Sequence, residues 1–155
     1  DLPAFLPVAM ICLFTLLLSC SGRCPDEPGV YCDKAAGFHI TFPVDWEVEV
    51  DPGDGIAVRA VAPLEQDLDP AVFGTTFEVL VIRMPGSRDL DSFFETRIQK
   101  LPEGKPYYQL EDSGEIKTGG RKTKYVLYVT DTEPRYEARL EYIQEKGGTI
   151  YIFGS

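Results

Sequence analysis

The chain has 155 residues, which is enough for a leader and one domain of ordinary size. Its hydrophobic fraction of 44% and its charged fraction of 26% are those of a globular protein and not of a disordered one. The formal net charge of −10 argues against nucleic acid as a partner and against electrostatic docking on anionic lipid, because both are bound through clustered Lys and Arg.

The N-terminal segment is apolar: residues 2–18 carry no charged side chain, and residues 8–18 are almost wholly hydrophobic. A transmembrane helix needs about 20 apolar residues, and this run is slightly short and is interrupted by Pro3 and Pro7. A buried core helix is a second interpretation, although the segment has poor helix-start signals. The third is an export signal, in which an apolar core of about ten residues is followed by small residues.

The sequence Leu17-Leu18-Ser19-Cys20 favours the export signal, because it resembles the lipobox of bacterial lipoproteins. In that motif a branched apolar residue lies three positions before the cysteine and a small residue lies just before it; Leu18 is somewhat large for its position. Cleavage between Ser19 and Cys20 would leave an acylated N-terminal Cys20. We therefore expect residues 1–19 to be a lipoprotein signal peptide, with an uncleaved anchor as the alternative. Acyl chains on Cys20 would hold the protein at a membrane surface.

Both ends of the chain indicate a longer protein. The leader begins with Asp1 and has no Lys or Arg before it, whereas a signal peptide normally opens with positive charge. At the other end, the apolar β-type run Thr149–Phe153 is followed only by Gly154 and Ser155. We expect further sequence on either side.

Cys24 and Cys32 are the cysteines that remain with Cys20 after the leader, which contains Cys12, has been removed. Outside the cytoplasm, a pair of this kind predicts a disulfide; two free thiols are the alternative. Two cysteines and one distant His do not make a four-ligand zinc site. Residues 20–36 are rich in Pro, Gly and charge, and we expect them to form a flexible tether to a domain over residues 37–155.

The first half of the domain predicts four strands. Apolar and polar residues alternate over residues 38–42, which is typical of a half-buried strand, and again from Trp46 to Val50. The sequence Asp-Pro-Gly-Asp-Gly at 51–55 is a strong turn signal before a third strand over 56–62. Residues 75–83 are apolar at Phe77 and from Val79 to Ile82, which suits a central strand covered on both faces.

One helix is predicted from Asp89 to Leu101. Asp89 can cap it, its apolar residues fall on one stripe at helical spacing, and Pro102 ends it. Strands are expected after it at about 107–117, 122–130, 136–146 and 149–153. Strands grouped before and after a single helix predict an α+β domain with a largely antiparallel sheet.

Four stretches of this domain are similar to the PsbP-like and DcrB-like family of exported proteins. They are the opening strands with Pro43 and Trp46 at the turn (37–46), the helix (89–101), the Gly-containing turn and following strand (119–128), and the late hairpin (142–152). The resemblance extends over residues 37–155. It implies an antiparallel sheet flanked by helices, in an α/β/α sandwich whose C-terminal helix would lie beyond Ser155.

The same resemblance implies that the domain is not an enzyme. Members of the family are commonly exported or membrane-tethered, and the photosynthetic ones act as assembly or stabilising subunits. The family shares no catalytic motif.

The residues themselves predict no catalytic site. His39, the only histidine, falls on the outward side of an alternating strand, and no nucleophile elbow or phosphate-binding Gly loop is present. Trp46, Tyr107 and Tyr108 could line a groove, but aromatic residues in strands more often belong to the core.

No metal or cofactor site is predicted either. Asp51, Asp54, Asp67 and Asp69 could supply oxygen ligands, yet they lack the spacing of a calcium loop, and Asp is a common turn former. The sequence therefore predicts a lipoprotein of the cell envelope, facing the periplasm or the exterior, with a non-catalytic domain that contacts an envelope protein. A cation-binding or small-molecule-binding lipoprotein is the alternative, and a hydrolase is a more distant one.

Overall fold

The structure is a computed structural model that describes residues 24–63, 74–84, 89–105, 107–132 and 135–155. The predicted signal peptide, Ser19 and Cys20, and the acidic residues Asp67 and Asp69 lie outside these ranges. Within them, no helix has the length and apolar character needed to cross a membrane.

The chain divides into two compact units between Phe42 and Pro43. In the first unit, strands β1 (Val30–Asp33) and β2 (Phe38–Thr41) form an antiparallel hairpin in which Cys32 lies opposite His39. Cys24 and Cys32 are joined in a disulfide with their Cα atoms 5.7 Å apart. The alternation along β2 is as predicted, because Phe38 and Ile40 are buried and His39 is half-buried.

The expected tether over residues 20–36 is therefore wrong for its last part. Residues 30–33 form a strand, and the expected domain boundary at residue 37 falls inside the hairpin. The sequence Val-Tyr-Cys-Asp is too short to show a period among Pro, Gly and charged neighbours. Its β conformation depends on hydrogen bonds to β2 and not on a pattern of its own.

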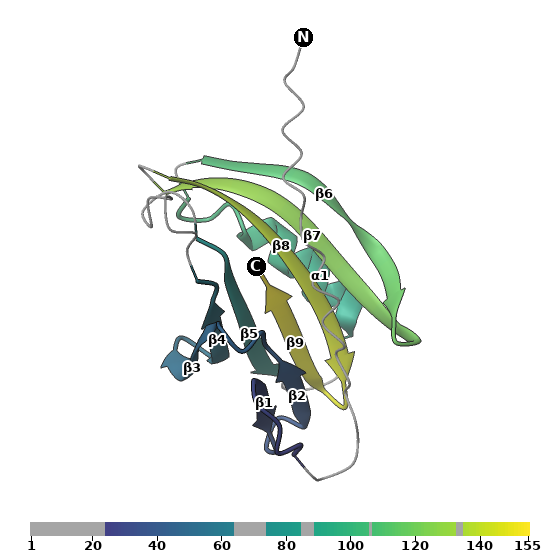
Figure 1. Ribbon diagram of the computed structural model, residues 1–155. Helices are drawn as coiled ribbons and strands as arrows, with labels where there is room; N and C mark the ends of the chain where they lie inside the picture. Colours follow the sequence, from purple (N-terminus) through teal and green to yellow (C-terminus); the bar gives the residue numbers. More distant parts are fainter. Residues whose placement is uncertain (1–23, 64–73, 85–88, 106, 133–134) are drawn as a thin grey trace. The chain divides into compact units, whose positions relative to one another are not determined.

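The second unit is a seven-stranded antiparallel sheet in the order β3-β4-β5-β9-β8-β7-β6 (Figure 1). Its strands are β3 (Glu47–Gly53), β4 (Ile56–Val61), β5 (Thr76–Arg83), β6 (Tyr107–Thr118), β7 (Arg121–Thr132), β8 (Arg135–Lys146) and β9 (Thr149–Gly154). The last strand in the sequence lies in the middle of the sheet, between β5 and β8. Its residues from Ile150 to Phe153 are all buried, which explains why β9 is apolar on both faces.

Helix α1 (Leu90–Lys100) connects β5 to β6 and packs across β7 and β8 (Figure 1). Asp89 is its N-cap, since its carboxylate accepts a hydrogen bond from the Ser92 amide at 2.8 Å. Asp91 in the first turn forms ion pairs with Lys122 and Lys124 of β7, which joins the start of the helix to the sheet.

One apolar cluster fills the space between α1 and the sheet. Its buried members are Leu90, Phe94 and Leu101 around the helix and Val126, Tyr128, Ile143, Ile150 and Ile152 on the strands. The predicted helix, its cap and its apolar stripe are thus confirmed, as is a mostly antiparallel sheet. The described residues contain this one α-helix.

Truncation of Ile143 tests the importance of this cluster. The side chain is fully buried on β8, and we expect Ile143→Ala to lower the free energy of unfolding by about 2–5 kcal/mol, because it removes apolar contacts and leaves a cavity. Chemical denaturation monitored by circular dichroism measures the change. Val44→Ala is the control, since Val44 is 81% exposed. An equal effect of the two substitutions would contradict the assignment of the core.

Candidate functional site

Of the residues that the sequence singled out, Cys24 and Cys32 are brought together in the disulfide described above, whereas Cys20, Asp67 and Asp69 lie outside the described residues. Asp51 and Asp54 lie at the β3–β4 connection with φ angles of 52° and 55°, so their place in the fold is that of turn residues. His39 lies in the first unit. Among the described residues, no group of three or more His, Cys, Asp or Glu side chains could hold a metal ion.

The sheet face that carries α1 also carries a row of charged residues. The strand registers place Glu49, Arg59, Glu78, Gly154 and Glu141 side by side across five strands. Residues directly opposite one another on neighbouring strands point to the same face. Four charged side chains therefore meet on the face where the helix packs, and Gly154 leaves a gap in the row.

Glu78 is the centre of the first half of this row. It accepts a hydrogen bond from Arg59 Nε at 2.8 Å and another from Arg139 Nη2 at 3.1 Å. Glu49 lies farther out and is 3.5 Å from Arg59 Nη1. The Glu78 side chain is only 13% exposed, so its charge depends on the two guanidinium groups for compensation.

Glu141 is the centre of the second half. It receives two parallel hydrogen bonds from Arg97 of α1, at 2.6 and 2.8 Å, and a third from the Tyr128 hydroxyl at 3.0 Å. This two-pronged pairing is the strongest geometry that Arg and a carboxylate form. Burial, with the neighbouring Glu141 carboxylate, raises the pKa of Tyr128 well above its usual range. The hydroxyl therefore stays protonated and can donate.

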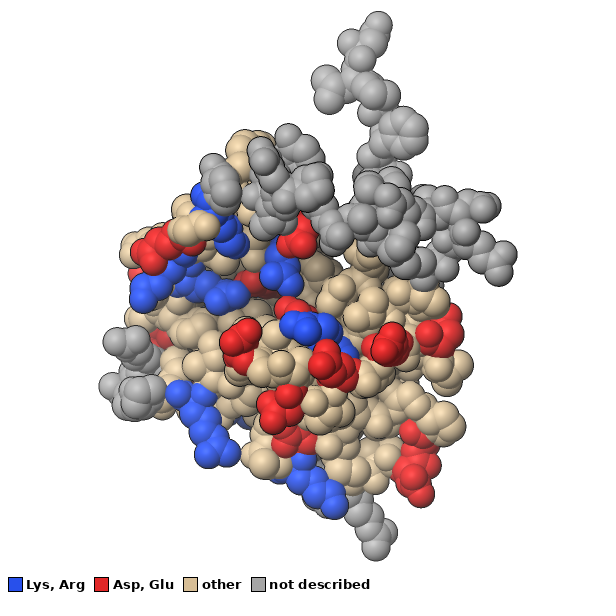
Figure 2. All heavy atoms as spheres, turned by 90° about the vertical axis from the view of Figure 1, so that its left-hand side faces the viewer, with Lys and Arg blue, Asp and Glu red and all other residues tan. Residues whose placement is uncertain are grey.

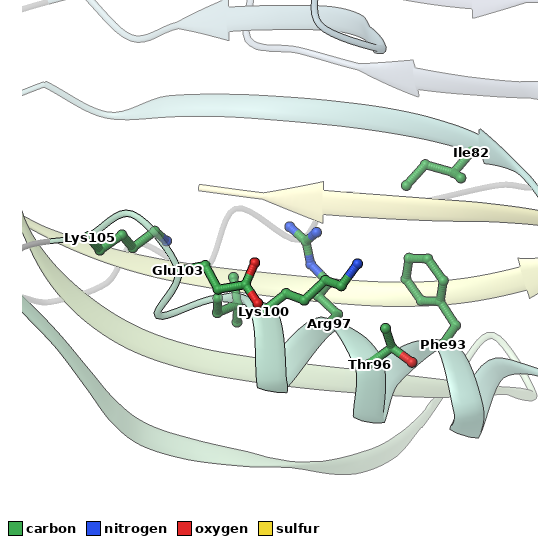
Figure 3. A pocket seen from close by; sticks show the side chains of 8 residues that line it. Ile82, Phe93, Thr96, Arg97, Lys100, Glu103 and Lys105 are labelled. Atoms are coloured by element: carbon green, nitrogen blue, oxygen red, sulfur yellow. The ribbon is translucent and has the colours of Figure 1, made fainter.

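A cleft of about 370 Å³ opens beside these pairs, between the second half of α1 and the sheet. Figure 3 shows Arg97 and Lys100 extending from the helix, Glu103 and Lys105 following in the next connection, and Ile82 of β5 on the other side. Phe93 and Leu101 add apolar surface. The cleft thus combines an apolar wall with three cationic side chains and one carboxylate.

Lys105 has an unusual environment in this cleft. Its ammonium nitrogen lies 4.5 Å from the centre of the Tyr128 ring and 5.8 Å from that of Tyr108. Burial lowers the pKa of Lys105. The Tyr108 hydroxyl is also buried, and it has no hydrogen-bond partner among the described residues.

The opposite side of strands β6, β7 and β8 presents an apolar surface, which we call the open face. The registers pair Tyr125 with Tyr142 and Leu127 with Leu140, and Ile116 lies on the neighbouring strand β6. Ile116 is 40% exposed and Tyr142 is 37% exposed, while the other three are half-buried. The sheet thus carries an ionic cleft on one face and an apolar surface on the other.

Charges elsewhere are mixed. Figure 2 shows acidic and basic side chains interspersed over one side of the molecule, with several basic side chains grouped on one part of it. A net charge of −10 therefore does not mean that every surface is acidic.

The fold has a known counterpart. No family model and no curated protein sequence matches the chain. Among solved structures, it is similar to the solution structure of cyanobacterial PsbP (CyanoP) from Synechocystis sp. PCC 6803, with a TM-score of 0.60 over 88% of this chain and 83% of that chain. The chain has a PsbP-like fold.

The similarity shows the fold alone, because the two sequences are 17% identical. A protein of unknown function from Pseudomonas aeruginosa is also similar, with 11% identity and a TM-score of 0.48 over 75% of this chain and 74% of that one, which is too low to add to the argument. The PsbP-like resemblance predicted from the sequence is thus confirmed at the level of the fold.

Sequence reasoning missed the cleft and the ionic row. Arg97 and Glu141 are 44 residues apart, and Arg139 and Glu78 are 61 residues apart. Neither ion pair can therefore be predicted from the spacing of residues along the chain. One weak signal was present. Glu141 lies on the buried side of β8, at a position where an apolar residue would be expected. A buried charge needs a partner of opposite charge.

The pH dependence of stability tests the Tyr128–Glu141 contact. We expect Tyr128→Phe to lower the free energy of unfolding near neutral pH by about 1.5–3 kcal/mol, because a hydrogen bond to a charged acceptor is lost. The raised pKa of Tyr128 favours the folded state only while the tyrosine of the unfolded chain is protonated. Above about pH 10 the unfolded chain loses that proton and the wild type loses stability relative to the variant.

Urea unfolding of both proteins between about pH 8 and about pH 11 measures this difference. Tyr107→Phe is the matched control, because Tyr107 is exposed on the edge strand β6. A constant difference between wild type and Tyr128→Phe across this range would contradict the assignment.

Proposed function

We propose that this protein is a membrane-anchored bacterial lipoprotein whose domain binds an envelope protein and does not catalyse a reaction. The observation that carries the proposal is the open face. On this face the registers pair Tyr125 with Tyr142 and Leu127 with Leu140, and Ile116 lies on β6 opposite Thr123 of β7. Contiguous apolar surface of this kind marks sites of protein interaction, and aromatic residues are enriched in the centres of interfaces.

The charged groups of the second unit support a binding role. Glu78 is paired with two arginines, and Glu141 is paired with Arg97 and Tyr128, which favours a structural role for both carboxylates over that of a general base. The one histidine of the chain lies in the first unit. The PsbP-like fold agrees with this proposal but is not evidence against an activity.

The lipobox-like Leu17–Cys20 supports the anchor, which would place the domain in the cell envelope facing the periplasm or the exterior. The complete α/β/α sandwich, with a helix after Ser155, is part of the same proposal. A small-molecule-binding lipoprotein is the second candidate, and the cleft beside α1 is the observation that favours it.

Acylation is tested by one substitution. We expect Cys20→Ala to abolish incorporation of an alkyne-tagged fatty acid, because no thiol remains at the processed N-terminus. In-gel fluorescence after labelling of growing cells measures the incorporation. Cys12→Ala, within the leader, is the matched control and should be labelled normally. Labelling that persists in Cys20→Ala would exclude the predicted attachment site.

The open face is tested by adding charge to it. We expect Ile116→Lys combined with Tyr142→Lys to reduce crosslinking of the full-length protein to its envelope partner by about tenfold, because a charge buried in an apolar contact must be desolvated. Quantitative mass spectrometry of crosslinked membranes measures the partner. Both residues are substantially exposed, so the thermal unfolding midpoint should change little.

Val44→Lys is the control, since Val44 is exposed and lies before β3, outside the open face. Unchanged crosslinking in the double variant, or an equal loss in Val44→Lys, would show that the open face is not the binding surface.

A further inference from the structure

Two polar groups at the cleft beside α1 have no ionic or hydrogen-bond partner among the described residues: Lys105 lines the cleft, and Tyr108 lies next to Lys105. The Lys105 ammonium has no carboxylate at ion-pair distance within the described residues, and it lies over the aromatic rings of Tyr128 and Tyr108. The ring of Tyr108 lies beneath the same ammonium, and its buried hydroxyl has no hydrogen-bond partner in the part of the chain that the structure describes. A buried polar group without a hydrogen-bond partner lowers the stability of a folded protein. Two such donors beside the packed rings of Tyr108 and Tyr128 indicate a place where a ligand could supply the acceptor.

The charges that line the cleft are unbalanced toward positive, because Arg97, Lys100 and Lys105 outnumber one carboxylate, that of Glu103. The carboxylates of Glu78 and Glu141 are occupied by the three arginines described above. Lys100 lines the same cleft, and no ion pair joins it to a described carboxylate. Burial also lowers the pKa of Lys105, which a bound anion would reverse. The cleft therefore favours a negatively charged occupant, within a protein that is acidic as a whole.

We propose that the cleft between α1 and the sheet binds a carboxylate with an apolar body, held by the ammonium group of Lys105, with Lys100 as a second cation that lines the same cleft. Ile82, Phe93 and Leu101 supply the apolar wall against which that body packs. A cavity of about 370 Å³ lies within the range of small-ligand sites. This site lies on the face opposite the open face, so it does not depend on the proposed protein interaction.

The arrangement favours a carboxylate over a phosphate. Arg97 extends from the helix among the residues that line the cleft (Figure 3). Its guanidinium group is already committed to Glu141 by two hydrogen bonds. Arginine forks pair with carboxylates and phosphates alike, and this one is not available to a ligand. The groups that remain are two ammonium ions, with Glu103 nearby to repel a second negative charge. A single negative charge fits these groups best.

Isothermal titration calorimetry of the full chain in detergent with phenylbutyrate tests the proposal. We expect binding by the wild type, and binding about tenfold weaker or worse for Lys105→Met, which keeps the length of the side chain and removes its charge. Phenylbutyramide, which is neutral and of nearly the same shape, should bind at least about tenfold more weakly than phenylbutyrate. Inorganic phosphate should not compete at equal concentration.

Lys117→Met is the matched control, because Lys117 is exposed on the edge strand β6 and lies outside the cleft. Lys100→Met provides a second variant: Lys100 is exposed, so the charge can be removed without disturbing the core. Thermal unfolding shows whether each variant is folded. No heat with phenylbutyrate, equal binding of the amide, or unchanged binding in both cleft variants would overturn the proposal.

The carboxylate could belong to a free small acid or to the C-terminus of a polypeptide. A short peptide ending in a free phenylalanine carboxylate and the same peptide with an amidated end separate these sources. Tighter binding of the free peptide than of phenylbutyrate, lost on amidation, identifies a polypeptide terminus. Weaker binding of the free peptide identifies a small acid. Either result assigns the site to a carboxylate.

Discussion

The second unit depends on the placement of β9 in the middle of the sheet. Strands β3, β4 and β5 precede α1, strands β6, β7 and β8 follow it, and β9 hydrogen-bonds to both groups. Without it, β5 and β8 would each be an unpaired edge next to a hydrophobic core. Because Ile150 and Ile152 face the helix while Tyr151 and Phe153 face the other way, the same strand also fills the core on both sides of the sheet.

Helix α1 covers only part of the sheet face on which it packs. The side chains of that face are apolar beneath the helix and charged beyond it. Under the helix the strands present Val126, Ile143 and Ile152. Toward β5, β4 and β3 they present Glu78 and Arg59 instead, which stay partly hydrated. Arg97 joins the two regions, since it belongs to the helix and pairs with Glu141 at the boundary. The cleft lies at this boundary because apolar packing stops there and charged pairs begin.

The elements of the second unit could be predicted because each has a local signal. Asp89 and Pro102 bracket the helix, and the Gly-Gly pair at 147–148 marks the last hairpin. The order of the strands and the identity of the ion pairs could not be predicted, because both depend on contacts between residues far apart in the chain. The strand Val30–Asp33 was missed for a related reason, since it is formed by pairing with β2 and has no pattern of its own. Likewise, β3 alternates as a half-buried strand would, yet Val48 and Val50 are exposed because β3 lies at the edge of the sheet.

The two surfaces proposed for binding are built on shared strands, and the alternation of β structure separates them. On β7, Tyr128 lies under Lys105 in the ionic region, whereas its neighbour Leu127 points to the open face. A substitution on one surface therefore leaves the side chains of the other in place, although the two are one residue apart. Coupling between them would require the sheet itself to shift, and the central position of β9 opposes such a shift. Carboxylate binding and partner binding should consequently act as independent properties of one rigid sheet.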